Sequence, residues 1–279
     1  MKEEREKIAI LGCGWLGLQL AESLLSKGYE VKGSTTSESK LDLLKNAGIS
    51  PFQIQLEAHQ IIGTIEDFLK ETDVLVIDIP PGLRREVSTS NEMTFVNKVK
   101  TLIPFIEKSG IPKVIFVSST SVYGDVFPIV EITEETKPNP DTESGKQLVI
   151  AEGLLQLNPH FKTTVIRFGG LLGDDRHPIK FLAGRTNVEN PEAPVNMIER
   201  EDCIGIIEEI LKQVQHDKWG ETFNAVAPQH PTRKAYYHKK AELFHLPLPT
   251  FVENLASKGK IISSKKVETI LGYSFQKEI

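Results

Sequence analysis

The sequence predicts an α/β protein built on a doubly wound parallel sheet, with a small C-terminal α+β lobe. Short β-rich segments alternate with helical segments through the first 172 residues. Two of the strand segments, at 73–81 and 112–120, are apolar almost throughout, as is typical of strands buried on both faces. A glycine-rich turn at 12–17 joins the first strand segment to the first helical one. This order of elements is typical of a parallel sheet covered by helices on both faces.

Apolar spacing and glycines define the elements of this first part. The segment 16–28 has leucines at helical spacing and ends at a glycine, which is a common helix C-cap. The segment 37–48 begins with Ser and Glu and also ends at a glycine, so it too is expected to be a helix. The expected strands lie at 7–12, 29–35, 51–56, 73–81, 112–120 and 162–173. The expected helices lie at 16–28, 37–48, 65–72, 91–110 and 141–152.

The remainder of the chain has a less regular pattern. We expect a helix at 200–214 with acidic residues in its first turn, a short strand at 221–228, a helix at 232–246 and an extended segment at 247–252. The sequence therefore predicts two parts. Residues 1–172 would form a nucleotide-binding domain, and residues 173–279 would form a smaller substrate-binding lobe packed on it.

Composition narrows the class of protein. Of the 279 residues, 39% are hydrophobic and 25% are charged, which is ample for a large core. The net charge of −5 and the lack of a basic block argue against a nucleic-acid partner, and no apolar run is long enough for a membrane span. Cys13 and Cys203 are too isolated to suggest a disulfide framework or a zinc site. With no signal segment at the start, a cytoplasmic protein is expected.

The motif GCGWLG at 12–17 carries the strongest functional signal. It has the spacing G-x-G-x-x-G, follows a predicted strand and opens a predicted helix, which is the context of a dinucleotide-binding (Rossmann-type) turn. Gly12 would permit the tight turn, Gly14 would let a pyrophosphate approach the backbone, and Gly17 would let the helix pack closely. The amides around Cys13 and Leu16 would then face the phosphates. Trp15 could cover the cofactor or fill the mouth of the crevice.

The end of the second strand bears on the choice of dinucleotide. NAD-binding sites usually place a carboxylate there for the ribose 2′-hydroxyl, but this chain has Gly33 and Ser34. The cofactor is therefore expected to be NADP rather than NAD. The hydroxyls that could receive a 2′-phosphate, with Lys40 nearby, belong to Ser34, Thr35, Thr36 and Ser37.

A second motif, VSSTSVYGD at 117–125, follows a buried strand. Together with the glycine turn it resembles the short-chain dehydrogenase/reductase superfamily, in particular its NAD(P)-dependent epimerase/dehydratase branch. The resemblance extends over residues 7–230. It is supported by IDIPP (77–81), IRFGGLLGDDR (166–176), VNMIEREDCIGII (195–207, with Glu199 where His is usual) and GETFNAVAP (220–228). It implies a nucleotide-sugar or small carbonyl substrate, allows a homodimer, and places Ile79, Pro80, Pro81 and Ser118 beside the cofactor.

The resemblance also implies a Ser and a Tyr-x-x-x-Lys pair as the catalytic groups. Counting back from Tyr123 of the VYG motif gives Ser119 as the Ser that orients a substrate hydroxyl. Counts from Ser119 and from Glu152 both place the Tyr–Lys pair at Ser144 and Leu148. The chain is therefore similar to atypical members that have lost the pair, and Ser144 marks the position of the lost Tyr.

Several other side chains are candidates for the site. Lys146 lies two residues from the expected Lys position, about 200° round a helix, and could touch the cofactor only if the helix begins late. Tyr123 could pack structurally or act chemically. Arg84, Arg85 and Arg176 are expected on loops, where they could bind an anionic substrate or be solvated.

Two functions remain open on the sequence alone. One is an NAD(P)-dependent oxidoreductase or epimerase-like enzyme with an atypical active site. The other is a catalytically inactive protein that senses dinucleotides or serves as a scaffold.

Overall fold

The computed structural model describes residues 6–82, 93–212, 219–253 and 256–279. The chain divides into two compact units. Unit 1 comprises Met1–Ser119, Glu143–Ile166 and Ile210–Thr222, and unit 2 comprises Thr120–Thr142, Arg167–Glu209 and Phe223–Ile279. The chain thus passes between the units several times.

A seven-stranded sheet has the order β12-β9-β7-β6-β1-β2-β3. Its strands are β1 (Lys7–Leu11), β2 (Glu30–Thr35), β3 (Ser50–Gln53), β6 (Val74–Ile77), β7 (Lys113–Ser119), β9 (Lys162–Phe168) and β12 (Thr222–Ala225). Both β2 and β6 pair in parallel with β1. The chain proceeds outward from β1 to β3 and then in the opposite direction from β6, so the order reverses between β1 and β6. This confirms the doubly wound parallel sheet, and such a reversal is where ligands bind in these folds.

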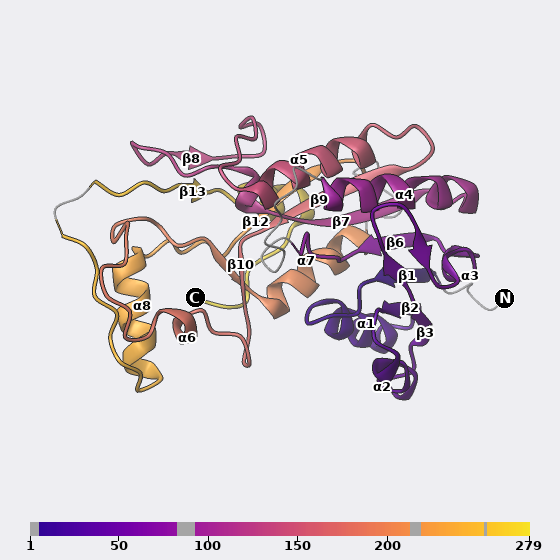
Figure 1. Cartoon of the computed structure of the whole chain (residues 1–279), viewed down its shortest axis with the longest axis horizontal. Helices are drawn as coiled ribbons and strands as arrows, with labels where there is room; N and C mark the ends of the chain where they lie inside the picture. Colours follow the sequence, from indigo (N-terminus) through magenta and orange to yellow (C-terminus); the bar gives the residue numbers. More distant parts are fainter. Residues whose placement is uncertain (1–5, 83–92, 213–218, 254–255) are drawn as a thin grey trace. The chain divides into compact units, whose positions relative to one another are not determined.

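Helices cover both faces of the unit 1 strands. Figure 1 shows α4 and α5 on one side of these strands and α1 and α2 on the other. The helices of unit 1 are α1 (Gly17–Ser26), the short 3-10 turn η1 (Glu38–Lys40), α2 (Leu41–Asn46), α3 (Ile65–Leu69), α4 (Thr94–Ser109) and α5 (Glu143–Gln156). The leucines of α1 bury one face, because Leu20 and Leu24 are fully enclosed. The helix ends where Gly28 takes a left-handed φ of 91°, as its sequence predicts.

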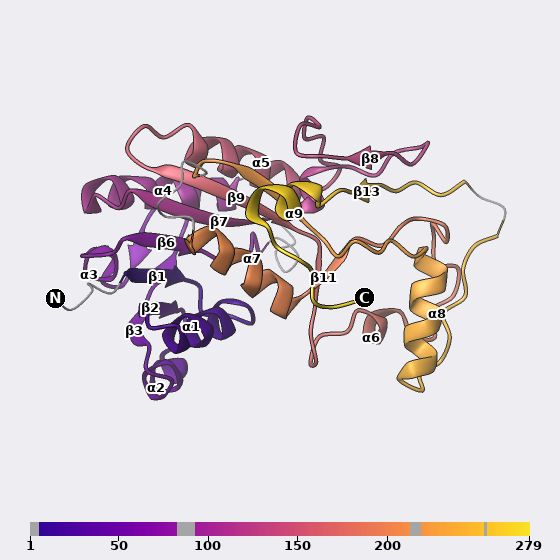
Figure 2. The same ribbon diagram turned by 180° about the vertical axis from the view of Figure 1, so that it is seen from behind.

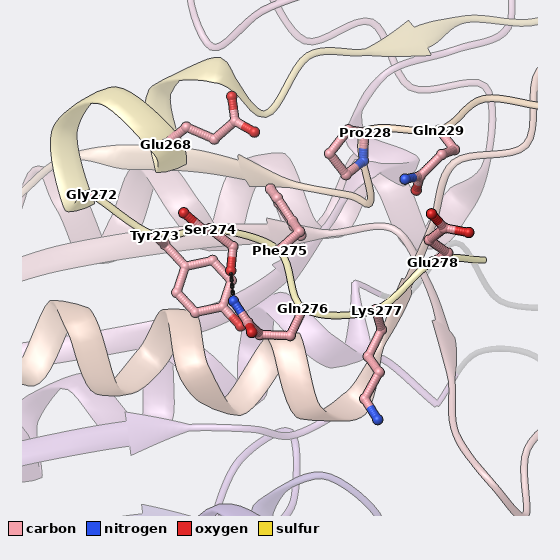
Figure 3. Close-up of a pocket in the computed structure, with 10 residues that line it drawn as sticks. All are labelled: Pro228, Gln229, Glu268, Gly272, Tyr273, Ser274, Phe275, Gln276, Lys277 and Glu278. Atoms are coloured by element: carbon pink, nitrogen blue, oxygen red, sulfur yellow. Dashed lines mark hydrogen bonds between the residues drawn. The ribbon is translucent and has the colours of Figure 1, made fainter.

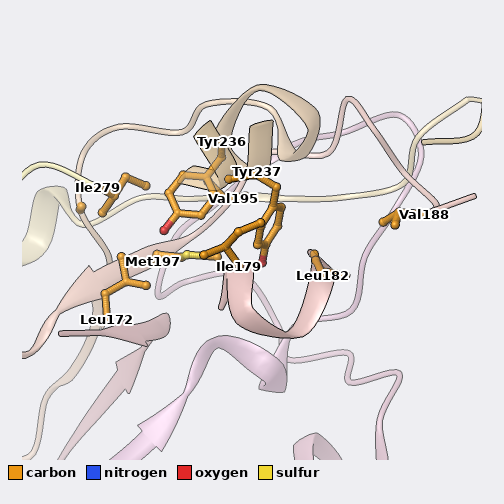
Figure 4. Packing of buried hydrophobic residues seen from close by; sticks show 11 residues of the cluster. Leu172, Ile179, Leu182, Val188, Val195, Met197, Tyr236, Tyr237 and Ile279 are labelled. Atoms are coloured by element: carbon orange, nitrogen blue, oxygen red, sulfur yellow. The ribbon is translucent and has the colours of Figure 1, made fainter. Parts of the chain in front are cut away.

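Unit 2 contains short elements around an apolar cluster. They are η2 (Thr120–Val122), β8 (Glu131–Ile132), β10 (Gly170–Leu172), α6 (Ile179–Leu182), β11 (Met197–Glu199), α8 (Arg233–Leu243), β13 (Ile261–Ile262) and α9 (Lys265–Leu271), and helix α7 (Arg200–Lys212) begins in this unit. Strands β10 and β11 pair in parallel, as do β13 and β8. Figure 4 shows the cluster, where Ile179 and Leu182 of α6 lie near Tyr236 and Tyr237 of α8. In Figure 2, β13 leads directly into α9.

The structure changes several predicted boundaries. The expected strand at 51–56 is divided into β3 and β4 (Gln55–Leu56), and β4 forms an antiparallel pair with β5 (Ile61–Ile62). The expected strand at 162–173 is likewise divided into β9 and β10, and the one at 73–81 ends at Ile77. The sequence indicated no element after residue 252, yet β13 and α9 lie there. No described helix combines the length and apolar character that a membrane span requires.

Candidate functional site

The glycine turn lies between β1 and α1, at the point where the strand order reverses. Gly12 has a φ of 111°, and a Cβ there would lie 2.2 Å from the carbonyl oxygen of Asp78. A Cβ on Gly17 would lie 2.2 Å from the Gly12 carbonyl oxygen, so the start of α1 packs directly on the turn. A Cβ on Gly14 would meet nothing within 4 Å. The turn is therefore tightly packed at its two ends and open in its middle, as a phosphate-binding turn requires.

The end of β2 supports this turn. The Gly12 amide donates to the Ser34 hydroxyl at 2.9 Å, and the Cys13 amide donates to the Ser34 carbonyl at 2.7 Å. Ser34 is buried, and so is Thr35, whose hydroxyl accepts a bond from the Ser37 amide. The two hydroxyls are thus engaged inside the protein. Thr36 is exposed, which leaves its hydroxyl at the surface.

The other predicted residues of the turn serve packing. Cys13 is buried, and burial, with Asp78 nearby, raises the pKa of its thiol to about 12, so the thiol is neutral. A Cβ on Gly33 would lie 2.6 Å from the Cys13 sulfur, which explains the glycine in β2. The Leu16 side chain lies in the core, and Trp15 is half-buried. Cys13 and Leu16 can therefore offer a ligand only their backbone groups.

Residues that follow β6 lie against the same turn. The Asp78 amide donates to the Leu11 carbonyl at 2.9 Å, and a Cβ on Gly12 would lie 3.3 Å from the Ile79 side chain. The Gly17 amide donates to the Asp78 carboxylate, but burial outweighs this bond and raises the pKa of Asp78 to about 7. Pro80 is exposed and Pro81 half-buried. The structure thus brings part of the predicted segment 77–81, namely Asp78 and Ile79, against the turn at 12–17.

The end of β7 and the start of α5 hold the predicted catalytic positions of unit 1. Ser119 is the last residue of β7 and is half-buried. The preceding Ser118 is buried, and its hydroxyl donates to the buried Glu152 carboxylate of α5 at 2.6 Å. This bond ties the strand to the helix on which the family places its Tyr–Lys pair.

Helix α5 forms where the sequence predicts it. Ser144 is its second residue and is half-buried, whereas Leu148 is buried in the core. The Lys146 ammonium lies 3.8 Å from the Glu143 carboxylate, and both side chains are more than half exposed. Position 148 therefore carries no charge, and Lys146 lies on the solvent face of the helix.

Tyr123 belongs to unit 2 and is almost fully buried. Its hydroxyl accepts a bond from the Arg167 guanidinium at 2.5 Å and lies 3.2 Å from the Asn224 side-chain oxygen. Burial raises the pKa of Tyr123, although Arg167 and Asn224 act in the opposite direction. The hydroxyl is therefore neutral and enclosed, and the geometry indicates a structural role.

Of the three arginines predicted to bind substrate, the described residues include one, Arg176. Arg176 is exposed on the loop between β10 and α6, and its amide bonds to the Gly173 carbonyl. The neighbouring His177 ring donates a hydrogen bond from Nε2 to the Asp174 carbonyl at 2.9 Å, and the centre of the ring lies 4.4 Å from that of the Phe244 ring. Arg84 and Arg85 lie outside the described residues.

A polar cluster in unit 2 was missed by the sequence analysis. Glu199 ends β11 and is half-buried; burial raises its pKa, while Lys240 and His177 lower it. Burial lowers the pKa of Lys240, whose ammonium lies 5.5 Å from the centre of the Tyr236 ring. In the sequence, only Glu199 pointed to this cluster, because it lies at a position where the family resemblance predicts a His.

Unit 2 also contains a polar cavity of about 450 Å³ (Figure 3). None of its lining residues was predicted as a site residue. They are Pro228, Gln229, Glu268 and the segment 272–278. Within the described ranges, no group of three or more His, Cys, Asp or Glu residues could hold a metal ion.

Comparison with known proteins identifies the family of this chain. Residues 8–157, more than half of the chain, match the NAD dependent epimerase/dehydratase family. Protein YeeZ of Escherichia coli (strain K12) is 37% identical over 273 residues, which cover 97% of this chain and 96% of that protein. A UDP-glucose 4-epimerase of Dictyostelium discoideum is 25% identical over 186 residues, or 59% of this chain and 54% of that protein.

A solved structure shows the same fold. The UDP-glucuronic acid 4-epimerase of Bacillus cereus, in complex with NAD, superimposes with a TM-score of 0.79 at 17% identity, covering 98% of this chain and 92% of that one. The glycine turn at the reversal of the sheet, the family match and this shared fold agree with one another. The chain belongs to the NAD-dependent epimerase/dehydratase family.

Proposed function

We propose that the protein is an NAD(P)-dependent oxidoreductase or epimerase-like enzyme with an atypical active site, which binds the dinucleotide on unit 1. The turn at 12–17 carries this proposal. Gly14 leaves space over the turn that any side chain would begin to fill, and Ser34 holds the Gly12 amide in place. The amides at the start of α1 favour a pyrophosphate there. When bound, the nicotinamide would accept or donate hydride.

The substrate proposed is a hydroxyl or carbonyl compound of the nucleotide-sugar or small-carbonyl class. Support comes from the two epimerases named above, whose names specify UDP-sugars. Ser119, at the carboxyl end of β7, would orient the reacting oxygen by a hydrogen bond. We assign substrate recognition to the lobe 173–279, where Arg176 and Glu199 offer charged groups.

Proton transfer cannot follow the usual route of the family. A Ser hydroxyl at 144 is a far weaker acid than a Tyr phenol, and Leu148 supplies no ammonium to favour a phenolate. The proposed enzyme therefore needs another proton donor or acceptor, such as the substrate itself or solvent. A reaction that requires little acid–base assistance is expected.

We propose NADP as the preferred dinucleotide because β2 ends without a carboxylate. Ser34 and Thr35 are engaged internally, so Thr36, Ser37 and the exposed Lys40 are the groups proposed to receive a 2′-phosphate. The family description and the Bacillus cereus complex name NAD, which favours the opposite choice. Titrating the fluorescence of NADH and NADPH decides between them: tighter binding of NADH would overturn the preference.

Turnover is tested after binding. Hydride transfer is followed with the bound dinucleotide across nucleotide sugars and small carbonyl compounds. Turnover of any of them supports the enzyme, whereas binding without turnover across the panel favours a dinucleotide sensor. If neither NADH nor NADPH binds, both the enzyme and the sensor are overturned.

Gly14→Asp is expected to abolish binding. Its side chain would project into open space, so the fold would be kept, but a carboxylate would meet the pyrophosphate. Gly153→Asp is a matched control, since a Cβ at that position of α5 also meets nothing within 4 Å. Loss of affinity of at least tenfold in Gly14→Asp alone, at an unchanged melting temperature, is the expected result. Equal affinity in both variants would contradict the proposed site.

A further inference from the structure

Asp78 lies beneath both ends of the glycine turn. It follows β6 directly, and its amide extends the pairing of β6 with β1 through a 2.9 Å bond to the Leu11 carbonyl. Its own carbonyl oxygen would be 2.2 Å from a Cβ on Gly12, and its carboxylate oxygen Oδ2 would be 3.1 Å from a Cβ on Gly17. One residue thus contacts the first and the last glycine of the motif.

The Asp78 carboxylate accepts a hydrogen bond from one of the amides to which a phosphate would bind. The Gly17 amide, at the first residue of α1, donates to it. Free amides at a helix N-terminus attract an anion, and an ionised carboxylate there satisfies one of them. It also places a negative charge next to the position where the turn would hold a pyrophosphate.

Few other charges act on Asp78. Burial raises its pKa to about 7, and the Gly17 amide alone opposes this effect among the described residues. The Cys13 thiol on the turn is neutral, because burial, with Asp78 nearby, raises its pKa to about 12. The first turn of α1 carries no acidic residue. The state of the Asp78 carboxyl therefore depends on its burial and on any anion brought to the turn.

We propose that Asp78 is a positioning residue that couples dinucleotide binding to proton uptake: the carboxyl takes a proton from solvent when the pyrophosphate settles on the turn. The inference rests on the proposed function, since it requires a dinucleotide. A nearby anion disfavours the ionised form of a carboxyl, so binding promotes its protonation. The protonated group can still accept the Gly17 amide through its carbonyl oxygen, so the turn keeps its geometry.

The coupling fixes the direction of a pH effect. Asp78 holds its proton more firmly in the dinucleotide complex than in the free protein, so the affinity for the dinucleotide is highest at low pH. It falls as the pH rises past the value at which free Asp78 ionises. If binding strengthens proton affinity tenfold, Kd rises about fivefold between pH 6 and pH 8.

The experiment is a set of fluorescence titrations with NADH and NADPH at pH 6, 7 and 8. The wild-type protein is expected to lose affinity about fivefold over this range, and Asp78→Asn is expected to keep a nearly constant Kd because its amide does not ionise. Asp42→Asn removes the same charge from the exposed surface of α2 and should behave as the wild type. An equal pH dependence in Asp78→Asn and the wild type would overturn the inference.

A second measurement needs no variant. Calorimetric titration of the wild type at pH 7.5, in two buffers of different ionisation enthalpy, counts the protons taken up on binding. A substantial fraction of one proton is expected, and none would overturn the coupling even if Asp78→Asn failed to fold. Binding without pH dependence or proton uptake removes the role of Asp78 and leaves the proposed function standing. If no dinucleotide binds at any pH, both the role of Asp78 and the proposed function are overturned.

Discussion

At the scale of single residues, Leu148 separates this chain from the pattern that it resembles. Its side chain is only 3% exposed, one turn of α5 before the buried Glu152. An ammonium at that position would need a partner or water, because an unpaired buried charge is very costly. Leu148 therefore packs in the core, which fits the prediction that this position no longer carries the ammonium of the family pattern.

Substitutions on α5 test this interpretation. Leu148→Ala is expected to lower the free energy of unfolding by about 2–5 kcal/mol, because it leaves a cavity. Leu148→Lys should cost more, since it buries a charge without a partner. Lys146→Ala should change stability by less than about 1 kcal/mol, because its pair with Glu143 is exposed. Urea unfolding measures all three, and a well-tolerated Leu148→Lys would show that position 148 can accommodate an ammonium.

At the scale of elements, one carboxylate fastens the segment 273–277 to α7. Asp202 is fully buried in the first turn of α7. It accepts bonds from the Tyr273 hydroxyl and the Gln276 amide, both at 2.7 Å, and from the Lys277 amide at 3.2 Å. Burial and this carboxylate raise the pKa of Tyr273, so its hydroxyl stays a donor. The segment thus has a defined path along the cavity of Figure 3.

Asp202→Ala is expected to release this segment. With three donors left unsatisfied, amide hydrogen exchange at 273–277 should accelerate at least tenfold, while β1 and β6 keep their protection. Glu201→Ala serves as the control, because Glu201 forms a surface ion pair with Lys277 of the same segment, and such pairs contribute little to stability. Unchanged exchange in Asp202→Ala would mean that other contacts fasten the segment.

The helix 141–152 shows what the sequence predicts well at this scale. Two counts along the chain placed it, and α5 forms over Glu143–Gln156. By contrast, α9 was not predicted, because it has only seven residues and buries only Val267 and Leu271. Short segments carry too few apolar positions to show a period. The sequence also did not predict the grouping of Glu199, Lys240 and His177, because these residues come from two elements and a loop that are distant in the chain.

At the scale of the whole molecule, the half-buried Asp78 makes stability depend on pH. Its pKa rises from an ordinary 3.8 to about 7 on folding, so folding favours the protonated form. This contribution to stability is fully present below about pH 4 and is lost as the pH rises through about 7. Folding therefore becomes less favourable over this range, as far as Asp78 is concerned.

Asp78→Asn removes this dependence. Relative to the wild type, the variant is expected to gain stability between pH 5 and about pH 7 and then to level off, because its amide is neutral throughout while Asp78 of the wild type ionises. Urea unfolding of both proteins at pH 5 and pH 8 measures the difference. A difference in unfolding free energy that stays constant between the two pH values would show that Asp78 titrates alike in the folded and unfolded chain.

The sequence by itself determined the sheet, its doubly wound order and the glycine turn, since apolar runs and glycines act locally and the right-handed connection leaves few topologies. Two motif counts along the sequence agree on Ser144 and Leu148 as the positions of the missing Tyr–Lys pair, and this assignment stays a prediction. Only the tertiary structure decided where polar groups point. It turned the Ser34 hydroxyl toward Gly12, enclosed Tyr123 with Arg167, and set Asp78 against the glycine turn. The physical reason is that hydrogen bonds and burial depend on neighbours from distant elements, which no local pattern specifies.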